Sequence, residues 1–285
     1  MNGLIVTADD FGAAAEINEA VEVGHRTGIL TAASLMVTGR SAADAVQRAR
    51  RAPSLRVGLH LVLVDGRPAS PPSAIPDLVG RDGQFRNDMA KVGVEIFLRP
   101  KVRRQLALEI GAQFEAFRAT GLPLDHVNAH KHFHLHPTIS GLIITIGRRF
   151  GMRAARVPAE PRSVLALVEP GMKAQLDYLV SPWSAVLRSR FDRAGLLVPQ
   201  NVFGLAWSGA MTANRVAALL RRLPLGLNEI YLHPATSDRF DGAVSGYRHA
   251  EEFAALTAPD VIEAARGTRA RLGGYADFDA ARAAA

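Results

Sequence analysis

The chain has 285 residues, 48% of them hydrophobic and 21% charged, a composition that argues against intrinsic disorder and suits a single globular α/β domain. Its formal net charge of +7 comes from 34 basic and 27 acidic residues, but the arginines are scattered or in short pairs, so we expect no nucleic-acid partner. There is no cysteine, which excludes disulfides and cysteine-ligated zinc, so any metal ion must be held by histidine, aspartate or glutamate.

Short β-branched runs alternate with longer helical patterns, as is typical of βα units around a parallel sheet. The pattern predicts strands at 3–8, 31–37, 56–61, 125–129, 154–157 and 229–232, and helices at 13–27, 42–51, 101–120, 214–223 and 260–271, with one more opened by Pro137. Two segments break this rhythm, at about 62–98 and 158–210, and a long irregular loop inside a compact domain is usually functional. We therefore expect residues 1–285 to form one α/β domain, a distorted TIM-like (β/α) barrel with two insertions.

Two adjacent carboxylates, Asp9 and Asp10, come directly after the first apolar strand in the sequence ADDFG. Burying two carboxylates there is costly unless a cation or hydrogen-bond donors stabilise them. One aspartate could simply cap the following helix, but a cap does not explain both. We therefore interpret the pair as part of a functional site.

Histidines gather at two further strand ends. His60 closes the third strand, where a histidine is often only a satisfied core residue. Five of the nine histidines then fall between His126 and His136, at alternating positions. Alternate side chains of a strand share a face, so His126, His130 and His132 could point the same way.

An aspartate and two histidines presented from three strand ends would meet at the rim where parallel barrels gather function. Such a set, with open positions, suits a borderline divalent ion such as zinc. The second aspartate could take a proton from the attacking water. His233, just past the apolar strand at 229–232, is a candidate general acid or, alternatively, a structural turn residue.

These residues give the sequence its resemblance to a known family. TADDFG, GLHLVL, NAHKHFHLHP, LHPA and the closing LGGY occur in an order and spacing that resemble the YdjC/ChbG-like carbohydrate deacetylase family over almost the whole chain. SLMVTG, LDHVNAHKHFHLHPT and RVPAEP are similar to its HpnK-type branch, which is associated with hopanoid biosynthesis.

The resemblance implies a hydrolase of the linear amide bond in an N-acetylated sugar. It makes Asp9 the catalytic base and His233 the general acid, and it makes Asp10, His60 and His130 the ligands of one divalent ion, with zinc favoured over magnesium, manganese or nickel. It leaves His132 and His134 as candidate substrate-binding residues. Asn128 stands where relatives often have aspartate. A homodimer is plausible on the same grounds.

The HpnK-type branch implies an acetylglucosaminyl hopanoid as the substrate. The alternatives are a soluble chito-oligosaccharide, a peptidoglycan fragment, or a non-catalytic role in binding glycolipids. Residues 172–198 predict a basic amphipathic helix that could contact the inner membrane peripherally or cover a lipid tail, with a core-facing helix as the alternative. Its apolar stripe would comprise Leu176, Leu179, Val180, Trp183, Val186 and Leu187.

The sequence also bears on where the protein resides. It reaches two carboxylates after only a short apolar run, unlike a signal peptide. No apolar stretch approaches the roughly 20 residues of a membrane span. We therefore expect a cytoplasmic protein.

Overall fold

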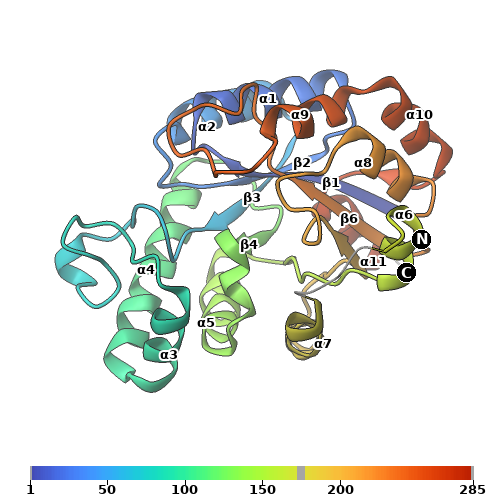
Figure 1. The fold of residues 1–285 in the computed structure, drawn as a ribbon. Coiled ribbons are helices and arrows are strands. Elements are labelled where there is room, and N and C mark those ends of the chain that lie inside the picture. The colour runs from blue at the N-terminus through green and yellow to red at the C-terminus, as the bar shows by residue number, and fades with distance from the viewer. Residues whose placement is uncertain (1, 172–176, 284–285) are drawn as a thin grey trace.

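A computed structural model describes residues 2–171 and 177–283, and these form an α/β fold around one curled parallel sheet (Figure 1). The strands are β1 (Gly3–Phe11), β2 (Ala32–Leu35), β3 (Arg56–Leu61), β4 (Val127–Ala129), β5 (Asn201–Phe203), β6 (Leu227–Leu232) and β7 (Arg271–Leu272). The α-helices are α1 (Ala15–Thr27), α2 (Ala42–Arg51), α3 (Met89–Leu98), α4 (Pro100–Ala119), α5 (Pro137–Gly147), α6 (Arg162–Val168), α7 (Asp177–Arg193), α8 (Ala213–Leu220), α9 (His249–Thr257), α10 (Pro259–Gly267) and α11 (Tyr275–Ala283). Short 3₁₀ helices are η1 (Pro72–Ala74), η2 (His130–Leu135) and η3 (Arg148–Phe150).

The sheet has the order β4-β3-β2-β1-β6-β5, with β7 paired to β1, and its strand pairs are parallel. β1 lies at its centre and is buried along its whole length, which explains its continuous apolar run. The segment 154–159 connects the two edges, because Ala155 bridges to Val127 of β4 and Ala159 bridges to Val202 of β5. The curled sheet is thus a distorted TIM-like barrel, as the sequence predicts.

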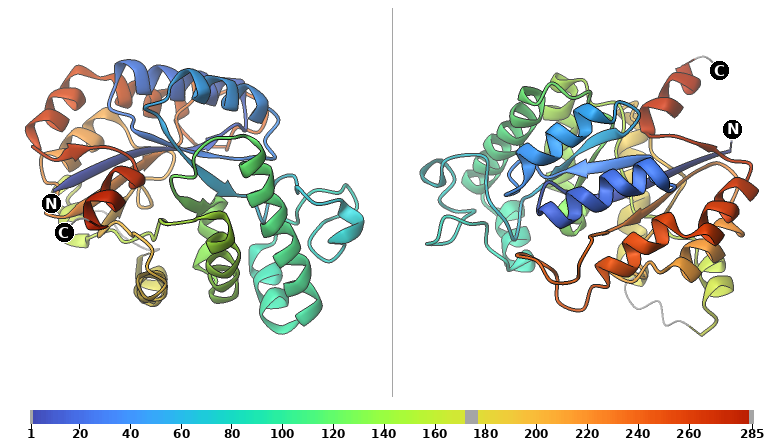
Figure 2. Two further views of the ribbon diagram at one scale, coloured as in Figure 1. Left: turned by 180° about the vertical axis from the view of Figure 1, so that it is seen from behind. Right: turned by 90° about the horizontal axis from the view of Figure 1, so that it is seen from above.

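Helices cover both outer sides of the curled sheet. α1, α2, α9 and α10 lie on one side, and α4, α5 and α7 lie on the other (Figures 1 and 2). Since the strands are parallel, their carboxyl ends open toward one rim, and the segment 62–98 projects beside that rim. This rim carries the candidate site.

The first insertion is more ordered than the sequence predicts, because it contains η1 and α3. Three polar side chains of α4, spaced four residues apart and buried in the core, hold the backbone of the insertion. Gln113 accepts from Val62 N, Glu109 accepts from Ala69 N and Ser70 N, and Gln105 accepts from Asp77 N, at 2.8–2.9 Å. This ladder satisfies the backbone groups of a segment that lacks a strand partner.

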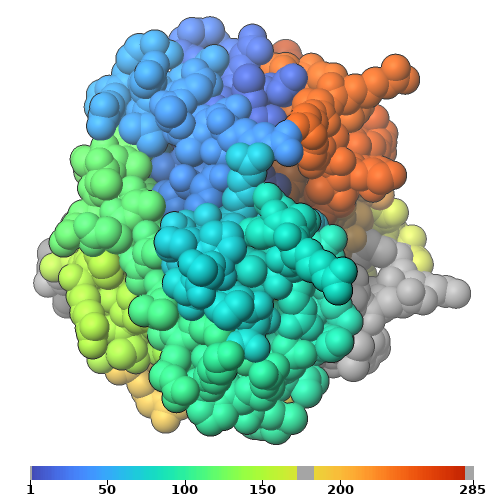
Figure 3. Space-filling view, turned by 90° about the vertical axis from the view of Figure 1, so that its left-hand side faces the viewer, coloured from blue at the N-terminus to red at the C-terminus, as the bar shows by residue number. Residues whose placement is uncertain are grey.

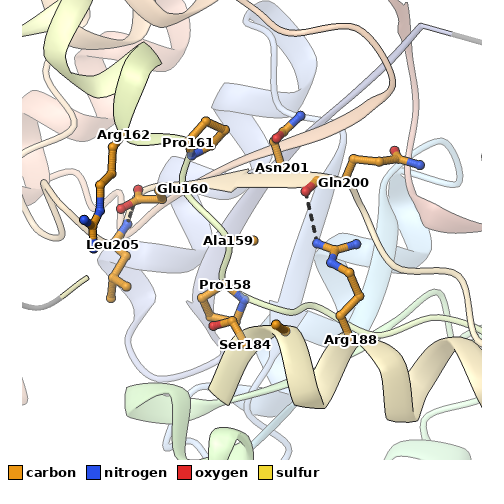
Figure 4. Close-up of a pocket in the computed structure, with 11 residues that line it drawn as sticks. Pro158, Ala159, Glu160, Pro161, Arg162, Ser184, Arg188, Gln200, Asn201 and Leu205 are labelled. Carbon is orange, nitrogen blue, oxygen red and sulfur yellow. Dashed lines mark hydrogen bonds between the residues drawn. The ribbon is translucent and has the colours of Figure 1, made fainter. Parts of the chain in front are cut away.

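The second insertion contains α6, α7 and β5. α7 is fastened to the barrel wall by Arg188, which donates to the carbonyls of Pro199 and Gln200 at 2.7 and 3.0 Å beside a cavity of about 330 Å³ (Figure 4). Burial lowers the pKa of Arg188. Across the same cavity, Glu160 accepts from the backbone N–H groups of residues 204–206.

The apolar stripe predicted along α7 is only partly described. Residue 176 and the side chains of residues 177–182 lie outside the described part. Among the rest, Leu187 is buried, whereas Trp183 and Val186 are 53 and 51% exposed. The basic residue Arg190 donates inward, to Pro137 O and Ser140 Oγ, so the last turns of α7 belong to a core-packed helix. Within the described residues, no helix combines the length and the hydropathy that a membrane crossing requires.

Candidate metal centre and active site

Both aspartates of β1 face the rim because the strand is irregular there. Consecutive residues of a regular strand point to opposite sides of the sheet. Between Ala8 and Phe11 the register with β2 shifts, and Asp10 has φ 61°, in the left-handed region that a non-glycine residue adopts at a cost of about 1–3 kcal/mol. The irregularity brings Asp9 and Asp10 into the same site, and the local strain marks the site as functional.

Asp10 meets two histidines from neighbouring segments. Its Oδ1 lies 3.2 Å from Nε2 of His60, at the end of β3, and 3.2 Å from Nδ1 of His130, just past β4. Each of the three side chains offers one possible metal-ligating atom, and these three atoms all lie within 4.8 Å of one another. Burial raises the pKa of Asp10, but the contacts with His130 and His60 outweigh it and hold the pKa well below its ordinary value.

This donor set fits a divalent ion. One carboxylate oxygen and two imidazole nitrogens lie close enough together to hold one ion beside the cleft, and catalytic zinc sites use the same kinds of ligand. The set does not distinguish zinc from other borderline or hard divalent ions. It is the trio that the family resemblance implied as metal ligands.

Asn128 orients His60. Its Oδ1 accepts from His60 Nδ1 at 2.7 Å, while its Nδ2 donates to Asp9 Oδ1 at 3.2 Å and to Ser34 Oγ at 3.0 Å. A flipped amide would turn its oxygen toward the Asp9 carboxylate, so this orientation is the consistent one. The proton of His60 therefore sits on Nδ1, and the lone pair of Nε2 faces the site, as metal ligation requires.

His126 does not join the metal trio, and whether it shares a face with His130 stays a prediction. Its Nδ1 donates to Asp125 at 2.9 Å and its Nε2 accepts from Ser34 Oγ at 3.0 Å. The strand alternation stops after Ala129, because η2 begins at His130 and Lys131 and His132 both have φ 53°. Asp125, His126, Ser34 and Asn128 thus form a buried chain of hydrogen bonds that ends on His60.

Asp9 is 2% exposed and forms an ion pair with Arg156, which is fully buried. Arg156 also contacts Glu229 through Nε and Nη2, at 3.1 and 2.8 Å. Burial raises the pKa of Asp9, but Arg156, His60 and His233 together outweigh it, and the pKa stays well below its ordinary value. Asp9 is therefore an ionised carboxylate beside Asp10.

Sequence reasoning missed Arg156 and Glu229 as members of this site. Arg156 lies in the RVPAEP motif, which it used only for the family resemblance. Glu229 interrupts the buried strand LNEIYL, which is the same signal that singled out Asp9.

The two candidate substrate-binding histidines lie behind the metal trio. His132 Nε2 bonds the hydroxyl of Tyr231 at 2.9 Å. His134 is 1% exposed and its Nε2 donates to the Arg156 carbonyl at 3.1 Å. Burial lowers the pKa of both, that of His134 to about 3, so both are neutral. These contacts favour structural roles, and substrate contact by either residue stays a prediction.

His233 lies near the trio, at the carboxyl end of β6. Its backbone N–H donates to Glu252, and its ring packs edgewise against Tyr231 and Tyr247, with centroids 5.8 and 5.3 Å away. His233 is one of the neighbours that lower the pKa of Asp9. Within the described residues, its Nδ1 is buried without a hydrogen-bond partner.

A cleft of about 390 Å³ opens over Asp10 and His130, a volume in the range of small-molecule sites. Apolar walls alternate with polar groups along it. Its walls include Ala13, Ile17, Met36, Val62, Phe85, Phe240 and Val244, with Arg40, Asp65, Arg67, Asp82, Gln84, Asn87 and Asp241 among the polar residues. In Figure 3, which faces the rim, residues of the first insertion stand in front of this region.

Fold and site together define a parallel α/β barrel protein with a candidate two-histidine, one-aspartate metal centre at its carboxyl rim. The family of YdjC-like proteins matches residues 3–266, and the chain belongs to this family.

Named relatives extend this finding. A chitooligosaccharide deacetylase of Klebsiella pneumoniae is 30% identical over 276 residues, which are 96% of this chain and 98% of the relative. A carbohydrate deacetylase of Brevibacillus brevis is 36% identical over 147 residues, 52% of this chain, and the match spans only 56% of that relative. The crystal structure of an Enterococcus faecalis V583 protein assigned to cellobiose-phosphate cleavage superposes with a TM-score of 0.76 at 23% identity, covering 98% of this chain and 99% of that one. This last likeness concerns the fold.

Proposed function

We propose that this protein is a metal-dependent N-deacetylase that hydrolyses the acetamide of an N-acetylated sugar. The observation that carries the proposal is the convergence of Asp10, His60 and His130 on one point, with the ionised Asp9 beside them. The deacetylase names of the relatives support the reaction class, and they favour an enzyme over a non-catalytic glycolipid-binding protein.

Asp10, His60 and His130 would hold the divalent ion. When bound, such an ion supplies Lewis-acid chemistry, polarising the acetamide carbonyl and lowering the pKa of the attacking water. Asp9 is the base. Each of its oxygens already accepts one hydrogen bond, from Asn128 and Arg156, and a carboxylate has about four acceptor positions, so it retains capacity to take the water proton.

His233 is proposed to protonate the leaving amine. Its Nδ1 is the atom without a partner within the described residues, whereas its backbone groups are fixed by Glu252 and His249. A ring whose backbone is anchored and whose nitrogen is uncommitted can present a proton without breaking a structural hydrogen bond. Its role is an extension of the proposal, separate from the metal trio.

For the substrate, we propose an acetylglucosaminyl hopanoid. The support is the resemblance to the HpnK-type branch together with the cleft, whose walls include the apolar residues Met36, Phe85 and Phe240. A soluble chito-oligosaccharide is the competing substrate, favoured by the name of the Klebsiella relative. We propose zinc as the ion, a cytoplasmic location, and a homodimer as the assembly. The exposed side chains of Trp183 and Val186 support a peripheral membrane contact by residues 172–198.

Acetate release measured in parallel on N,N′-diacetylchitobiose and on an acetylglucosaminyl hopanoid separates the two substrates. The variant Asp9→Asn tests the base: it should bind zinc with unchanged affinity and lose turnover by about 10²–10⁴-fold. Near-normal turnover of Asp9→Asn would contradict the base assignment. If neither substrate released acetate, the proposed reaction would be contradicted.

A further inference from the structure

α3 carries apolar side chains on both of its sides. Val92 and Ile96 are buried against the core, whereas Val94, Phe97 and Leu98 are 57, 58 and 66% exposed. A surface helix normally presents polar residues to solvent opposite its core-facing side. A cluster of large exposed apolar side chains on one helix instead marks an interaction surface.

The surroundings of this apolar cluster are basic. The corner between α3 and α4 has the sequence FLRPK over residues 97–101, and its cations Arg99 and Lys101 are 50 and 62% exposed. Both pair with Asp77, which is only 18% exposed, so the cations lie outside and the acid inside. Arg103 and Arg104, in the first two turns of α4, are exposed as well. The exposed charge of the corner is therefore positive.

The corner lies one helix length from the cleft. Asn87 lines the cleft, and Asp88 caps α3 by accepting from Lys91 N at 3.0 Å, so α3 begins where the cleft wall ends. The helix runs about 15 Å from that point to the corner. In Figure 1, α3 lies at the edge of the molecule, below the loop of the first insertion that precedes it.

We propose that this corner patch, made of Val94, Phe97 and Leu98 with the cations of residues 99–104, docks on an anionic lipid bilayer. Large apolar side chains entering the interface, flanked by Arg and Lys that contact acidic headgroups, are the two elements of peripheral membrane binding. Docking there keeps the cleft within about 15 Å, one helix length, of the docked corner.

Charge argues against a second copy of the chain as the occupant. A two-fold interface brings the same patch of both subunits together. The patch holds cations and apolar side chains but no acidic one, so a second copy would offer the cations of residues 99–104 no partner of opposite charge, and like charges brought together across an interface are costly. An anionic surface complements them.

Co-sedimentation with vesicles tests the proposal on the full chain. The wild-type protein should bind vesicles made of equal parts of phosphatidylglycerol and phosphatidylcholine. It should bind vesicles of pure phosphatidylcholine more weakly, and high salt should weaken its binding to the anionic vesicles. The double variant Phe97→Ser/Leu98→Ser should lower the partition coefficient about tenfold or more. Arg103→Glu/Arg104→Glu should lower it by a similar factor on anionic vesicles only.

The comparison variant is Trp183→Ser/Val186→Ser, which removes the exposed apolar pair of α7, the competing membrane surface, and should lower binding less than Phe97→Ser/Leu98→Ser does. All these side chains are exposed, so the variants should fold, and acetate release from a soluble substrate should stay at the wild-type level. The proposal is overturned if wild-type protein fails to sediment with anionic vesicles, or if only the α7 variant loses binding. It is equally overturned if Phe97→Ser/Leu98→Ser converts a dimer to a monomer, because a second copy then occupies the patch.

Discussion

Replacing Asn128 with leucine should weaken metal binding without changing any of the three candidate ligands. Asn128 makes three buried hydrogen bonds, and the one to His60 Nδ1, at 2.7 Å, fixes which nitrogen of that ring faces the site. Without that acceptor, the proton can move to Nε2 and compete with the ion. Loss of such a contact behind a metal-ligating histidine typically lowers metal affinity 10–100-fold, about 1.4–2.8 kcal/mol.

The matched control is Asn228→Leu. Asn228 is also fully buried and makes three hydrogen bonds, to Pro224 O, Gly226 O and Asn201 Nδ2, at the opposite end of the barrel. Each variant leaves buried partners unpaired and should lower the free energy of unfolding by roughly 3 kcal/mol. Only Asn128→Leu should lower the affinity for zinc.

Zinc affinity is measured by competition with a chelating dye, and stability by urea denaturation of the metal-free protein. Ser34→Ala should lower the affinity in the same direction but less, because the bond between His60 and Asn128 survives. Equal affinity losses in Asn128→Leu and Asn228→Leu would show a general effect of destabilisation. Unchanged affinity in Asn128→Leu would refute the orienting role of Asn128.

Three further predictions address packing, pH and metal dependence. Gly58→Ala should destabilise the fold by about 1–3 kcal/mol in urea denaturation, because an added Cβ would lie 2.5 Å from the His126 ring. Gly111→Ala should instead stabilise the fold by up to about 1 kcal/mol, because Gly111 lies within α4 and an added Cβ there would meet no atom within 4 Å. The reverse order of stabilities would contradict the packing around Gly58. The hydrogen bond from Arg56 lowers the pKa of Asp277. This partly exposed pair should therefore add at most about 1 kcal/mol to the free energy of unfolding above roughly pH 5, and this contribution should be lost as the pH falls through the lowered pKa. Asp277→Asn should reduce stability at pH 7 but not in strong acid, and an equal loss at both pH values would disprove the ionic origin. Dialysis against a chelator should abolish acetate release and added zinc should restore it, whereas activity that survives complete metal removal would exclude a metal-dependent reaction.

The sequence predicted those elements whose burial leaves a clear pattern. β1 and β3 are apolar runs that emerge with nearly the predicted bounds, β1 extending three residues further to Phe11. α3 was missed because it is apolar on both sides and therefore lacks the helical period of apolar and polar residues that a surface helix shows. β5 is only three residues long, too short to show a period. The segment 154–157 was predicted as a strand and forms isolated bridges instead.

The site was predictable only where the signal is local. Adjacent carboxylates after a buried strand are visible in the sequence, whereas the meeting of Asp10, His60 and His130 depends on pairing between strands up to 120 residues apart. The family resemblance supplied that pairing. Arg156 escaped notice because nothing in its neighbours reveals that its guanidinium reaches Asp9, 147 residues away.

The charge of the site differs in sign from that of the chain. Overall the formal charge is +7, yet the buried charged side chains around the site include the carboxylates of Asp9, Asp10, Asp125 and Glu229 and one guanidinium, that of Arg156. With the ligating histidines neutral, as ligation requires, the carboxylates outnumber the guanidinium, and a divalent cation would offset part of this negative charge. Buried charge of this kind is costly unless it is paired, so the residues around Asp9 and Asp10 supply an argument for a divalent ion that no composition of the whole chain could provide.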